Sequence, residues 1–536
     1  MNVNIASHLH SMAERFPRKD AIILCASGAK LTFEELDQES DRYAHGFTGV
    51  GITRGMRVAL LVPPGREFFT LAFALFKMGA VLVLIDPGMG LKNMLRCLGE
   101  INPEAFIGIP SALALKTLTR TLPTAKIKVT VGPRIFWGGH QLKKLRSKNN
   151  ARYEMAVTRA NDPAAILFTT GSTGLAKGAL YRHGMFDAQV RTLQKQYGIG
   201  TDEIDLPTFP LFALFDPALG MTAVIPDMDP RKPGFVRPEK IIGPIIKYGV
   251  THMFGSPALL DRVGRYGQAK GVKLPTLRRV ISAGAPVPPP VLERFASMLN
   301  RGVEIHTPYG ATEALPVATI GSAEIINDTS LETERGAGTC VGRPAGEIDI
   351  RIIGISDDAI EAWSPELLVT AGTVGEIVVR GPVVTREYFG REAATKLAKI
   401  PGEGDQVWHR MGDVGRFDET GRLWFFGRKA HRVVTEAGTL FSDPCEGIMN
   451  THPKVFRSAL VGVGKPGQQR PVMCIELKAG QRRGELENEL RVLAASNSIT
   501  SSIDTFLVHP KFPVDIRHNA KIFREKLAVW AGQRLS

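Results

Sequence analysis

The 536-residue sequence is poor in cysteine, with only five, at positions 25, 97, 340, 445 and 474. Their odd number and the absence of any C-x-x-C pair exclude a disulfide framework and a cysteine-based zinc site. The N-terminus also lacks the apolar segment and the cleavage site of a signal peptide. Both absences predict a cytoplasmic protein with reduced thiols.

Long hydrophobic runs are missing as well. The most apolar stretch, residues 68–85, is interrupted by Lys77 and Gly79, whereas a membrane-spanning helix needs about 20 predominantly apolar residues. A buried helix followed by a buried strand explains this stretch. We therefore expect a protein that does not span a membrane.

The overall composition is that of a globular protein, with 44% hydrophobic and 22% charged residues. This balance excludes wholesale disorder, and 55 glycines and 35 prolines without a G-X-Y period exclude collagen. At about 150 residues per domain, the length allows roughly three or four folding units, or two units of which one is large.

Positive charge is in excess, with 67 Lys and Arg against 53 Asp and Glu, a net charge of +14. The basic residues are spread along the chain, and only short clusters occur, such as Lys143, Lys144, Arg146 and Lys148. A solvated basic surface explains them, and no nucleic-acid partner is expected. An acidic ligand such as a nucleotide, or a peripheral contact with anionic lipid, would also suit this charge.

Alternating apolar strands and helices predict an α/β fold. Thr32 and Glu35 form a T-x-x-E capping box that opens a helix to about residue 47. A strand at 57–62, a helix at 66–78 and a strand at 80–85 follow. Continuous apolar strands in this order indicate a parallel sheet with both faces covered by helices.

The strand pattern returns several times and then changes character. Period-2 alternation near residues 348–380 indicates added β structure. Further apolar strands are expected at 105–109, 164–169, 253–256, 279–282 and 303–307, and a small α+β unit follows with strands at 458–463 and 472–477 and a helix at 485–495. We predict a large N-terminal domain of mixed and parallel sheets covered by helices, residues 1–427, and a small C-terminal α+β domain, residues 428–536.

The strongest local signal is AAILFTTGSTGLAKGAL, from Ala164 to Leu180, in which an apolar strand runs into a loop of Thr, Ser and Gly. Glycines let backbone N–H groups approach a phosphate, hydroxyls add donors or metal ligands, and a lysine adds positive charge. A Walker loop does not match, and a plain turn explains this run less well. The predicted phosphate-binding residues are Thr169, Thr170, Gly171, Ser172, Thr173, Gly174 and Lys177.

This loop resembles the ATP-phosphate motif of the adenylate-forming superfamily, which includes acyl-CoA synthetases, peptide-synthetase adenylation domains and luciferases. Further segments follow in the superfamily's order. SAGAPV, from Ser282 to Val287, resembles the segment that packs along adenine, and it would place Gly284 and Ala285 in the ATP site. The resemblance spans nearly the whole chain. It implies a large and a small domain joined by a hinge, with ATP bound between them.

YGATE resembles the superfamily's aromatic–Gly–x–Thr–Glu motif. There the aromatic ring stacks on adenine, the Thr lies near the phosphates and the Glu binds Mg²⁺. The resemblance thus implies ATP and Mg²⁺, with Glu313 and Thr169 as metal ligands, and Mg²⁺ does favour a carboxylate together with phosphate oxygens and water. The five residues assigned to the site are Tyr309, Gly310, Ala311, Thr312 and Glu313.

Two further motifs complete the resemblance. In MGDVGRFDETGRLWFFGRK, Asp413 matches the ribose-binding Asp and Arg428 matches the Arg at the domain junction. In RHNAKIFREKL, Lys521 matches the catalytic Lys, whose charge would stabilise adenylation. The catalytic residues implied are Lys521, Glu313 and Lys177.

Two departures from the superfamily pattern are informative. Acyl-CoA synthetases commonly carry a His after Pro–Leu–Phe in the acyl-site segment, where this sequence has Ala213. The hinge position two residues after the motif Arg is usually Asp or Lys, and here it is Ala430. The second departure puts a CoA-dependent half-reaction in doubt without excluding it, since small residues can also act as hinges.

With YRHGMF at 181–186 and RHNAK at 517–521, the chain is similar to one subgroup, the β-lactone synthetases of bacterial long-chain olefin biosynthesis. Those enzymes adenylate a 2-alkyl-3-hydroxy long-chain fatty acid, whose own hydroxyl then displaces AMP. An intramolecular nucleophile needs no CoA tunnel. The resemblance implies the thiolase-like, reductase and β-lactone decarboxylase enzymes of that pathway as partners.

Alternatives stay open at this stage. A fatty-acyl-CoA ligase or acyl-AMP ligase would use the same adenylate, and a non-catalytic relative is opposed by the intact motif residues. No base for the hydroxyl is evident, and His183 and His431 qualify by residue type alone. Phe212, Ala213 and Phe215 either line an acyl pocket or belong to the core.

Overall fold

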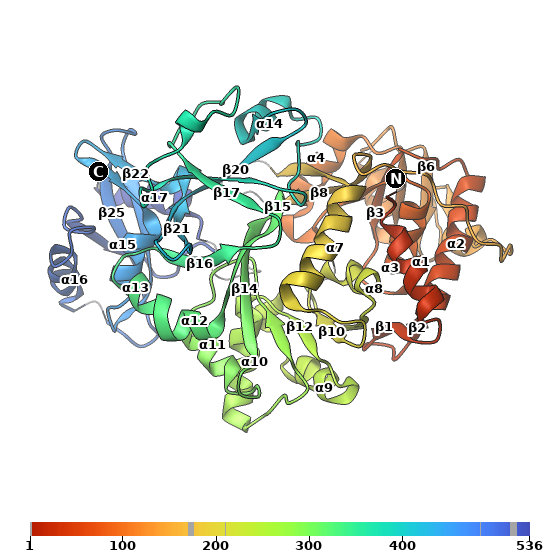
Figure 1. Cartoon of the computed structure of the whole chain (residues 1–536), viewed down its shortest axis with the longest axis horizontal. Coiled ribbons are helices and arrows are strands. Elements are labelled where there is room, and N and C mark those ends of the chain that lie inside the picture. The colour runs from red at the N-terminus through yellow and green to blue at the C-terminus, as the bar shows by residue number, and fades with distance from the viewer. Residues whose placement is uncertain are drawn as a thin grey trace.

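The computed structural model describes residues 3–119, 121–169, 176–209, 211–482, 484–514 and 522–535. Two large sheets lie side by side, and a smaller unit containing the C-terminus lies at one end of the molecule (Figure 1). This arrangement agrees with the large domain and the small C-terminal unit that the sequence predicts. The predicted mixed and parallel sheets are confirmed, and their strands divide between two large sheets.

The first large sheet has seven strands and lies at the N-terminal end. Its strands are parallel except for β9, which runs antiparallel to β8. In spatial order they are β7 (His140–Gln141), β6 (Ile127–Thr130), β5 (Ala105–Gly108), β3 (Arg57–Leu61), β4 (Val81–Leu84), β8 (Pro163–Thr169) and β9 (Lys177–Arg182).

Helices of the first half accompany this sheet. Those bounded by the structure are α1 (Ala6–Arg15), α2 (Phe33–Gly49), α3 (Arg66–Lys77), α4 (Leu91–Ile101), α5 (Pro110–Leu118), α6 (Leu142–Leu145) and α7 (His183–Tyr197). The capping box at the start of α2 is confirmed, because the Thr32 hydroxyl accepts from the Glu35 N–H and the Glu35 carboxylate accepts from the Thr32 N–H.

Lys77, which interrupts the most apolar stretch of the sequence, is itself buried at the end of α3. Its Nζ lies 2.6 Å from a carboxylate oxygen of Asp37 and 2.5 Å from one of Asp41. These two acids are spaced i, i+4 on α2 and therefore face the same side of that helix. A buried ammonium needs such partners, so the ion pairs fix how α2 packs on α3.

The second large sheet changes from parallel to antiparallel where β14 meets β15. A further strand, β19 (Lys399–Pro401), pairs with β20 at its side. In spatial order the main path is β2 (Lys30–Thr32), β1 (Asp20–Leu24), β11 (Thr222–Ile225), β10 (Ile204–Pro207), β12 (His252–Phe254), β13 (Arg279–Ile281), β14 (Glu304–Ala311), β15 (Ala314–Gly321), β16 (Thr339–Pro344), β21 (Leu423–Arg428), β20 (Val407–Phe417), β18 (Gly375–Arg380) and β17 (Asp349–Ile353).

The helices of this region are α8 (Asp216–Leu219), α9 (Glu239–Tyr248), α10 (Pro257–Lys270), α11 (Pro289–Ala296), α12 (Ser322–Glu324), α13 (Ser330–Glu334) and α14 (Glu392–Ala398). A 3₁₀ turn, η2 (Phe212–Leu214), leads into α8. The position of this turn matters for the functional site described below.

The C-terminal part of the chain builds its own cores. One gathers buried residues from Val433 to Phe506, and another those from Ala459 to Ala531. The boundary at 427/428 stays a prediction. The elements are β22 (Val433–Thr435), β23 (Gly438–Leu440), α15 (Ser442–Met449), β24 (Val455–Val463), β25 (Arg470–Leu477), α16 (Leu486–Ala495), β26 (Thr505–Val508) and α17 (Arg524–Leu535).

Two buried carboxylates interact, one on a strand of the second sheet and the other on a helix. Asp205 of β10 and Asp216 at the start of α8 are both nearly inaccessible to solvent. Burial raises the pKa of Asp216 to about 7, and burial together with Asp216 raises the pKa of Asp205. His252 lies 3.3 Å from Asp205, but burial lowers its pKa to about 3, so it supplies no compensating charge at neutral pH.

This pair predicts a pH-dependent stability. The unfolded chain releases the Asp216 proton near pH 4, whereas the folded chain holds it until near pH 7. The free energy of unfolding should therefore fall as the pH rises between these two values, and Asp216→Asn should remove that loss. We expect the thermal midpoint of Asp216→Asn to exceed that of the wild type at pH 8. This difference should be roughly 2–4 °C larger at pH 8 than at pH 5.

Thermal unfolding of both proteins at the two pH values checks this prediction. Asp405→Asn provides the control, because the Asp405 side chain is 85% exposed. A midpoint difference for Asp216→Asn that is the same at pH 5 and pH 8 would contradict the raised pKa of Asp216 in the folded chain.

Candidate functional site

A cavity of about 720 Å³ lies between the two large sheets and collects residues from distant parts of the chain. Leu84 and Asp86 line it at the end of β4, and Leu167 and Phe168 line it at the end of β8. Segments that carry four of the sequence motifs also reach it. Since parallel strands end at one edge of their sheet, these segments meet there although they are far apart in sequence.

The predicted phosphate loop connects β8 and β9, which pair in register at Thr169 and Lys177. Lys177 lines the cavity, and its Nζ lies 4.8 Å from the centre of the Tyr388 ring. Thr170, Gly171, Ser172, Thr173 and Gly174, as well as the side chain of Thr169, lie outside the described part of the structure. Their assignment to the ATP phosphates therefore stays a prediction.

Glu313 lines the cavity and is held by a tyrosine that sequence reasoning missed. The Tyr388 hydroxyl donates to Glu313 Oε1 at 2.6 Å. Burial, reinforced by the negative charge of Glu313, raises the pKa of Tyr388 above its usual range, so the phenol keeps its proton and acts as the donor. Tyr388 belongs to the segment between β18 and α14 and carries no motif that could have identified it.

The backbone of Glu313 is held by the same segment. The Thr385 N–H donates to the Glu313 carbonyl at 2.8 Å, and Lys399 Nζ donates to the Thr385 hydroxyl at 3.0 Å. Burial lowers the pKa of Lys399 to about 7. The carboxylate and the main chain of Glu313 are thus both fixed by residues 385–399.

The other motif residues differ in how they reach the cavity. Gly284, Gly310, Ala311 and Thr312 line it, whereas Ala285 is absent from its described lining. Gly284 has a positive φ of 98°, which a residue with a side chain rarely adopts. The Tyr181 hydroxyl donates to the Thr312 carbonyl at 2.6 Å and fixes the end of that motif.

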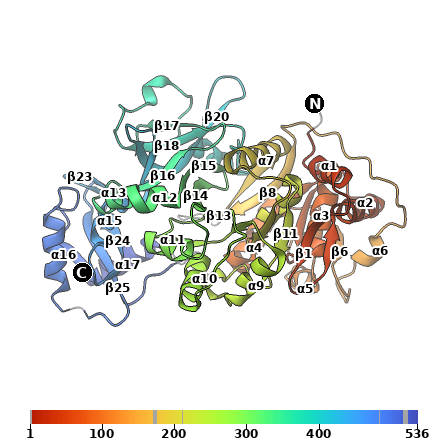
Figure 2. The same cartoon turned by 60° about the horizontal axis from the view of Figure 1, so that its bottom comes forward.

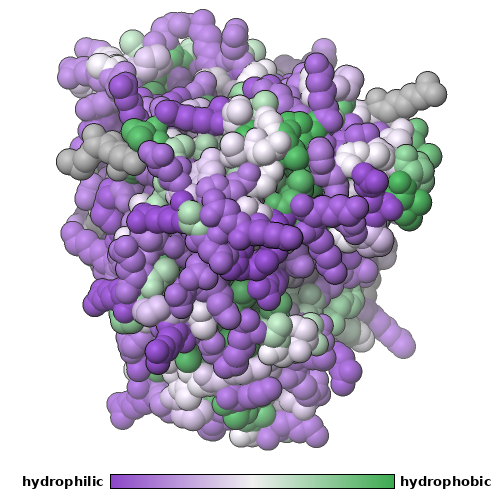
Figure 3. Space-filling view, turned by 90° about the vertical axis from the view of Figure 1, so that its right-hand side faces the viewer, coloured by the Kyte–Doolittle hydropathy of each residue, from purple (hydrophilic) through white to green (hydrophobic). Residues whose placement is uncertain are grey.

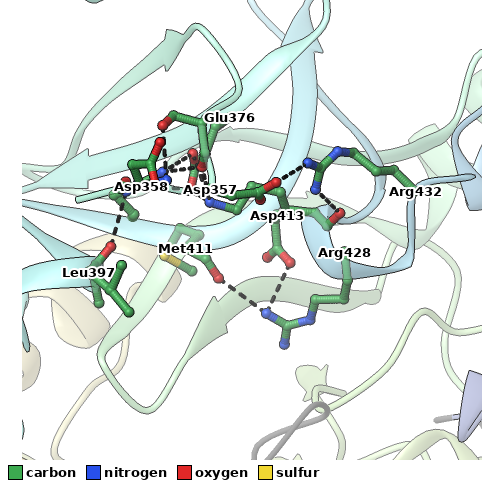
Figure 4. Close-up of polar contacts among 12 residues, drawn as sticks. Asp357, Asp358, Glu376, Leu397, Met411, Asp413, Arg428 and Arg432 are labelled. Atoms are coloured by element: carbon green, nitrogen blue, oxygen red, sulfur yellow. Dashed lines mark hydrogen bonds and ion pairs between the residues drawn. The ribbon is translucent and has the colours of Figure 1, made fainter. Parts of the chain in front are cut away.

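Asp413 and Arg428 face each other across the antiparallel pair β20–β21. Arg428 Nη1 lies 3.0 Å from Asp413 Oδ1 and donates to the Met411 carbonyl at 3.1 Å (Figure 4). The Tyr309 hydroxyl donates to Asp413 Oδ2 at 2.5 Å. Burial raises the pKa of Asp413 and the Arg428 charge opposes that rise.

This arrangement bears on the predicted nucleoside site. Arg428 is part of the described cavity lining, but Tyr309 and Asp413 are not. Both oxygens of Asp413 lie close to protein groups, but a carboxylate oxygen can accept a second hydrogen bond, so Asp413 keeps acceptor capacity for a ribose hydroxyl. The predicted stacking of Tyr309 on adenine and the ribose role of Asp413 stay predictions.

A second ionic network lies beside Ala430, the predicted hinge position. Arg410 donates to both oxygens of Glu376, at 3.1 and 2.7 Å, and both side chains are buried. Lys429 Nζ lies 3.1 Å from Glu376 Oε1, and Arg432 pairs with Asp357 across the junction (Figure 4). No motif indicated these contacts, because each pair joins residues from separate strands and loops.

Some residues of the acyl-site segment line the cavity, and others are buried in the core. Phe212 and Phe215 line the cavity, whereas Ala213 is fully buried and outside its described lining. The Phe212 ring lies 4.6 Å from that of Phe254, and the Phe215 ring lies 5.8 Å from that of Phe186. The apolar part of the cavity is thus walled by aromatic side chains on either side of η2.

His183 and His431, considered above as bases for the hydroxyl, are absent from the described lining of the cavity. His183 is buried and its Nδ1 accepts from the Ile5 N–H at 3.2 Å, while His431 lies 3.1 Å from Glu525. His409 lines the cavity instead, and its Nδ1 bonds the Ala398 carbonyl at 3.1 Å. Lys521, the predicted catalytic lysine, lies outside the described residues.

The ion pair between Asp413 and Arg428 generates a stability prediction. Asp413→Asn keeps the size of the side chain but removes the charge that compensates Arg428. Asp413 is buried but the Arg428 side chain is 36% exposed, so solvent screens the guanidinium left behind and we expect a cost of about 1 kcal/mol. We expect a lower urea midpoint for Asp413→Asn and an unchanged one for Asp405→Asn at an exposed position. Equal midpoints for the two variants would show that the pair adds no stability.

Two absences complete the description of the site. In the described ranges, no helix is both long and apolar enough to cross a membrane. Among the same residues, no group of three or more His, Cys, Asp or Glu side chains is arranged to hold a metal ion.

Comparison with known proteins agrees with this geometry. Residues 9–389 match the model of the family described as AMP-binding enzyme. The chain is 48% identical over 548 aligned positions to the olefin beta-lactone synthetase of Xanthomonas campestris pv. campestris, covering 99% of this chain and 98% of that protein. The olefin beta-lactone synthetase of Stenotrophomonas maltophilia matches with the same identity and coverage.

The fold also matches solved structures of low sequence identity. The amide bond synthetase McbA from Marinactinospora thermotolerans superimposes with a TM-score of 0.81 at 22% identity, covering 98% of this chain and 99% of McbA. The chain therefore belongs to the AMP-binding enzyme family and, within it, to the family of the olefin beta-lactone synthetases.

Proposed function

We propose that this protein uses ATP to adenylate the carboxylate of a 2-alkyl-3-hydroxy long-chain fatty acid and then closes the product to a β-lactone. The 48% identity to two olefin beta-lactone synthetases along nearly the whole chain carries this proposal. The cavity supports it, because aromatic walls adjoin the segments of the ATP motifs. A cytoplasmic location and contact with other enzymes of olefin synthesis belong to the same proposal.

The first step joins the carboxylate to the α-phosphate of ATP and releases pyrophosphate. Lys177 and Arg428 bring positive charge to the cavity where phosphates would lie. In this proposal Lys521 adds a cation at the reacting carboxylate and phosphate. Fixed charges of this kind stabilise negative charge that develops in the transition state.

The second step joins the β-hydroxyl oxygen to the acyl carbon, breaks the bond to AMP and releases the hydroxyl proton. The nucleophile and the acyl group belong to one molecule, so proximity alone gives a large effective molarity. The role left to the protein is to orient the chain and to exclude water, which would otherwise hydrolyse the adenylate. The aromatic walls at Phe212 and Phe215 suit that role.

The residues present fit Mg²⁺. Glu313 faces the cavity with a carboxylate whose orientation is fixed by Tyr388. Mg²⁺ is commonly held by one or two carboxylates together with substrate phosphates and water. When bound, it would neutralise charge on the phosphates. The assignment of Glu313 and of Thr169 as ligands is part of this proposal.

A product assay tests the proposed reaction. Purified protein with Mg-ATP and a synthetic 2-alkyl-3-hydroxy long-chain acid should form AMP, pyrophosphate and β-lactone in equal amounts without CoA. Ala213 and Ala430 favour this outcome over the rival, a fatty-acyl-CoA ligase. AMP release that requires CoA, together with a thioester product, would establish the ligase instead.

Tyr388→Phe tests how Glu313 is positioned. Removing the hydroxyl leaves the ring beside Lys177 but deprives Glu313 of its hydrogen-bond donor. Loss of such a partner typically weakens metal affinity by roughly 10–100-fold. We expect Mn²⁺ binding in the presence of a non-hydrolysable ATP analogue, measured by electron paramagnetic resonance, to weaken accordingly.

The matched control is Tyr153→Phe, which removes a hydroxyl that bonds Thr48 far from Glu313 in the chain. This variant should bind Mn²⁺ as wild type does. Wild-type affinity in Tyr388→Phe would remove the tyrosine from the metal site while leaving the product assay, and hence the proposed reaction, unaffected.

A further inference from the structure

Most of the chain's net excess of positive charge comes from one segment. Residues 105–153 contain ten Lys and Arg and no Asp or Glu. This segment, called the basic edge here, accounts for ten of the fourteen net positive charges of the protein. The cluster Lys143, Lys144, Arg146 and Lys148 therefore belongs to a longer stretch, which is defined by its lack of acidic residues.

The basic edge forms one side of the seven-stranded sheet. It contains β5, α5, β6, β7 and α6, and β7 is the terminal strand of that sheet. Figure 2 shows β6 and α6 at the end of the molecule opposite the C-terminal unit, and Figure 1 shows β6 at the same end. Basic side chains exposed on this edge are Lys126, Arg134, Lys143, Lys144, Arg146, Lys148 and Arg152.

Few of these charges are neutralised by the protein itself. Arg146 pairs with Glu39 of α2, and within the described ranges it is the one residue of the basic edge found in an ion pair. Lys116 and Lys128 lie close to each other, since Lys128 adds to the effect of burial in lowering the pKa of Lys116. Such an arrangement is stabilised by an anionic partner.

Apolar side chains project from the same edge. Ile135 is 66% and Phe136 is 62% exposed, although both are large and hydrophobic. They follow Arg134 in a loop that is anchored by the next residue, because Trp137 is buried and its Nε1 donates to the Thr130 hydroxyl at 2.8 Å. Leu118, at the end of α5, is 73% exposed.

Figure 3 looks onto this end of the molecule and shows hydrophobic patches set in a mostly hydrophilic face. Exposed apolar groups beside lysines and arginines match the two requirements of an anionic bilayer surface. The cations interact with lipid headgroups, and the apolar groups enter the boundary between headgroups and acyl chains. A single-stranded nucleic acid would use the cations and could stack a base on Phe136, but it would gain nothing from exposed Ile135 and Leu118.

We propose that the basic edge docks this protein onto the surface of a membrane rich in anionic lipid, with Ile135 and Phe136 entering the interface. The contact is peripheral. It rests on charge and exposure outside the cavity, so it stands independently of the reaction proposed above.

Vesicle co-sedimentation of the full chain tests this docking. The protein should bind vesicles of phosphatidylglycerol and phosphatidylcholine more tightly than vesicles of phosphatidylcholine alone, and added salt should weaken the binding. Each lysine near an anionic surface is worth roughly fivefold in affinity, so Lys143→Glu with Lys144→Glu should lose at least about twentyfold. Ile135→Ser with Phe136→Ser should lose roughly tenfold.

Matched controls separate this edge from general charge and hydrophobicity. Lys270→Glu with Arg301→Glu reverses two exposed charges elsewhere, and Phe235→Ser removes a phenylalanine that is 76% exposed on another segment. Both should bind anionic vesicles nearly as wild type does. Equal losses in controls and edge variants, or no preference for anionic vesicles at low salt, would overturn the proposal.

A duplex DNA of matched charge examines the rival partner in the same experiment. Salt-dependent DNA binding that is lost in Lys143→Glu with Lys144→Glu, without any binding to anionic vesicles, would assign the edge to a nucleic acid and refute the membrane proposal. All of these positions are at the surface, and an unchanged thermal midpoint would verify that each variant folds.

Discussion

The ion pair between the buried Asp413 and the half-buried Arg428 is the interaction on which the site depends most. It joins β20 to β21, and through Tyr309 it also joins β14, so three strands of the second sheet are fixed at the cavity. A register slip of one residue would turn each of these side chains to the other face of the sheet and leave a buried charge without its partner. The cost of an unpaired buried charge therefore fixes the register.

The same pair connects the cavity to the junction with the C-terminal unit. Arg428 ends β21, and the next residue, Lys429, joins the network of Glu376 and Arg410. Arg432 reaches back to Asp357 across Ala430. A polar side chain at position 430 is thus not needed to secure this junction, because charged neighbours on both sides secure it. Ala430, at the predicted hinge position, thus has charged neighbours that the sequence alone did not show to be paired.

The sequence predicted most of the strands, because buried strands are continuously apolar, and it singled out four motif segments that reach the cavity. It could not predict the pairs made by Tyr388 or Glu376, since their partners lie on other strands and no periodic pattern links them. Lys77 is an instructive intermediate case. It looked like an interruption of an apolar run, yet the i, i+4 spacing of Asp37 and Asp41 in a well-capped helix already contained its counter-charges.

The cost of burying an unpaired charge also explains how charge is distributed over the whole molecule. Within the cavity and beside Ala430, each cation discussed above faces a carboxylate, a carbonyl or an aromatic ring, because burial makes an unpaired charge costly. The basic edge has no such need, since water solvates its side chains. Folding does not require ten basic residues without a single acid, and like charges repel one another in the folded state. A partner outside the chain therefore explains this bias. The missing Asp and Glu contribute to it as much as the lysines present.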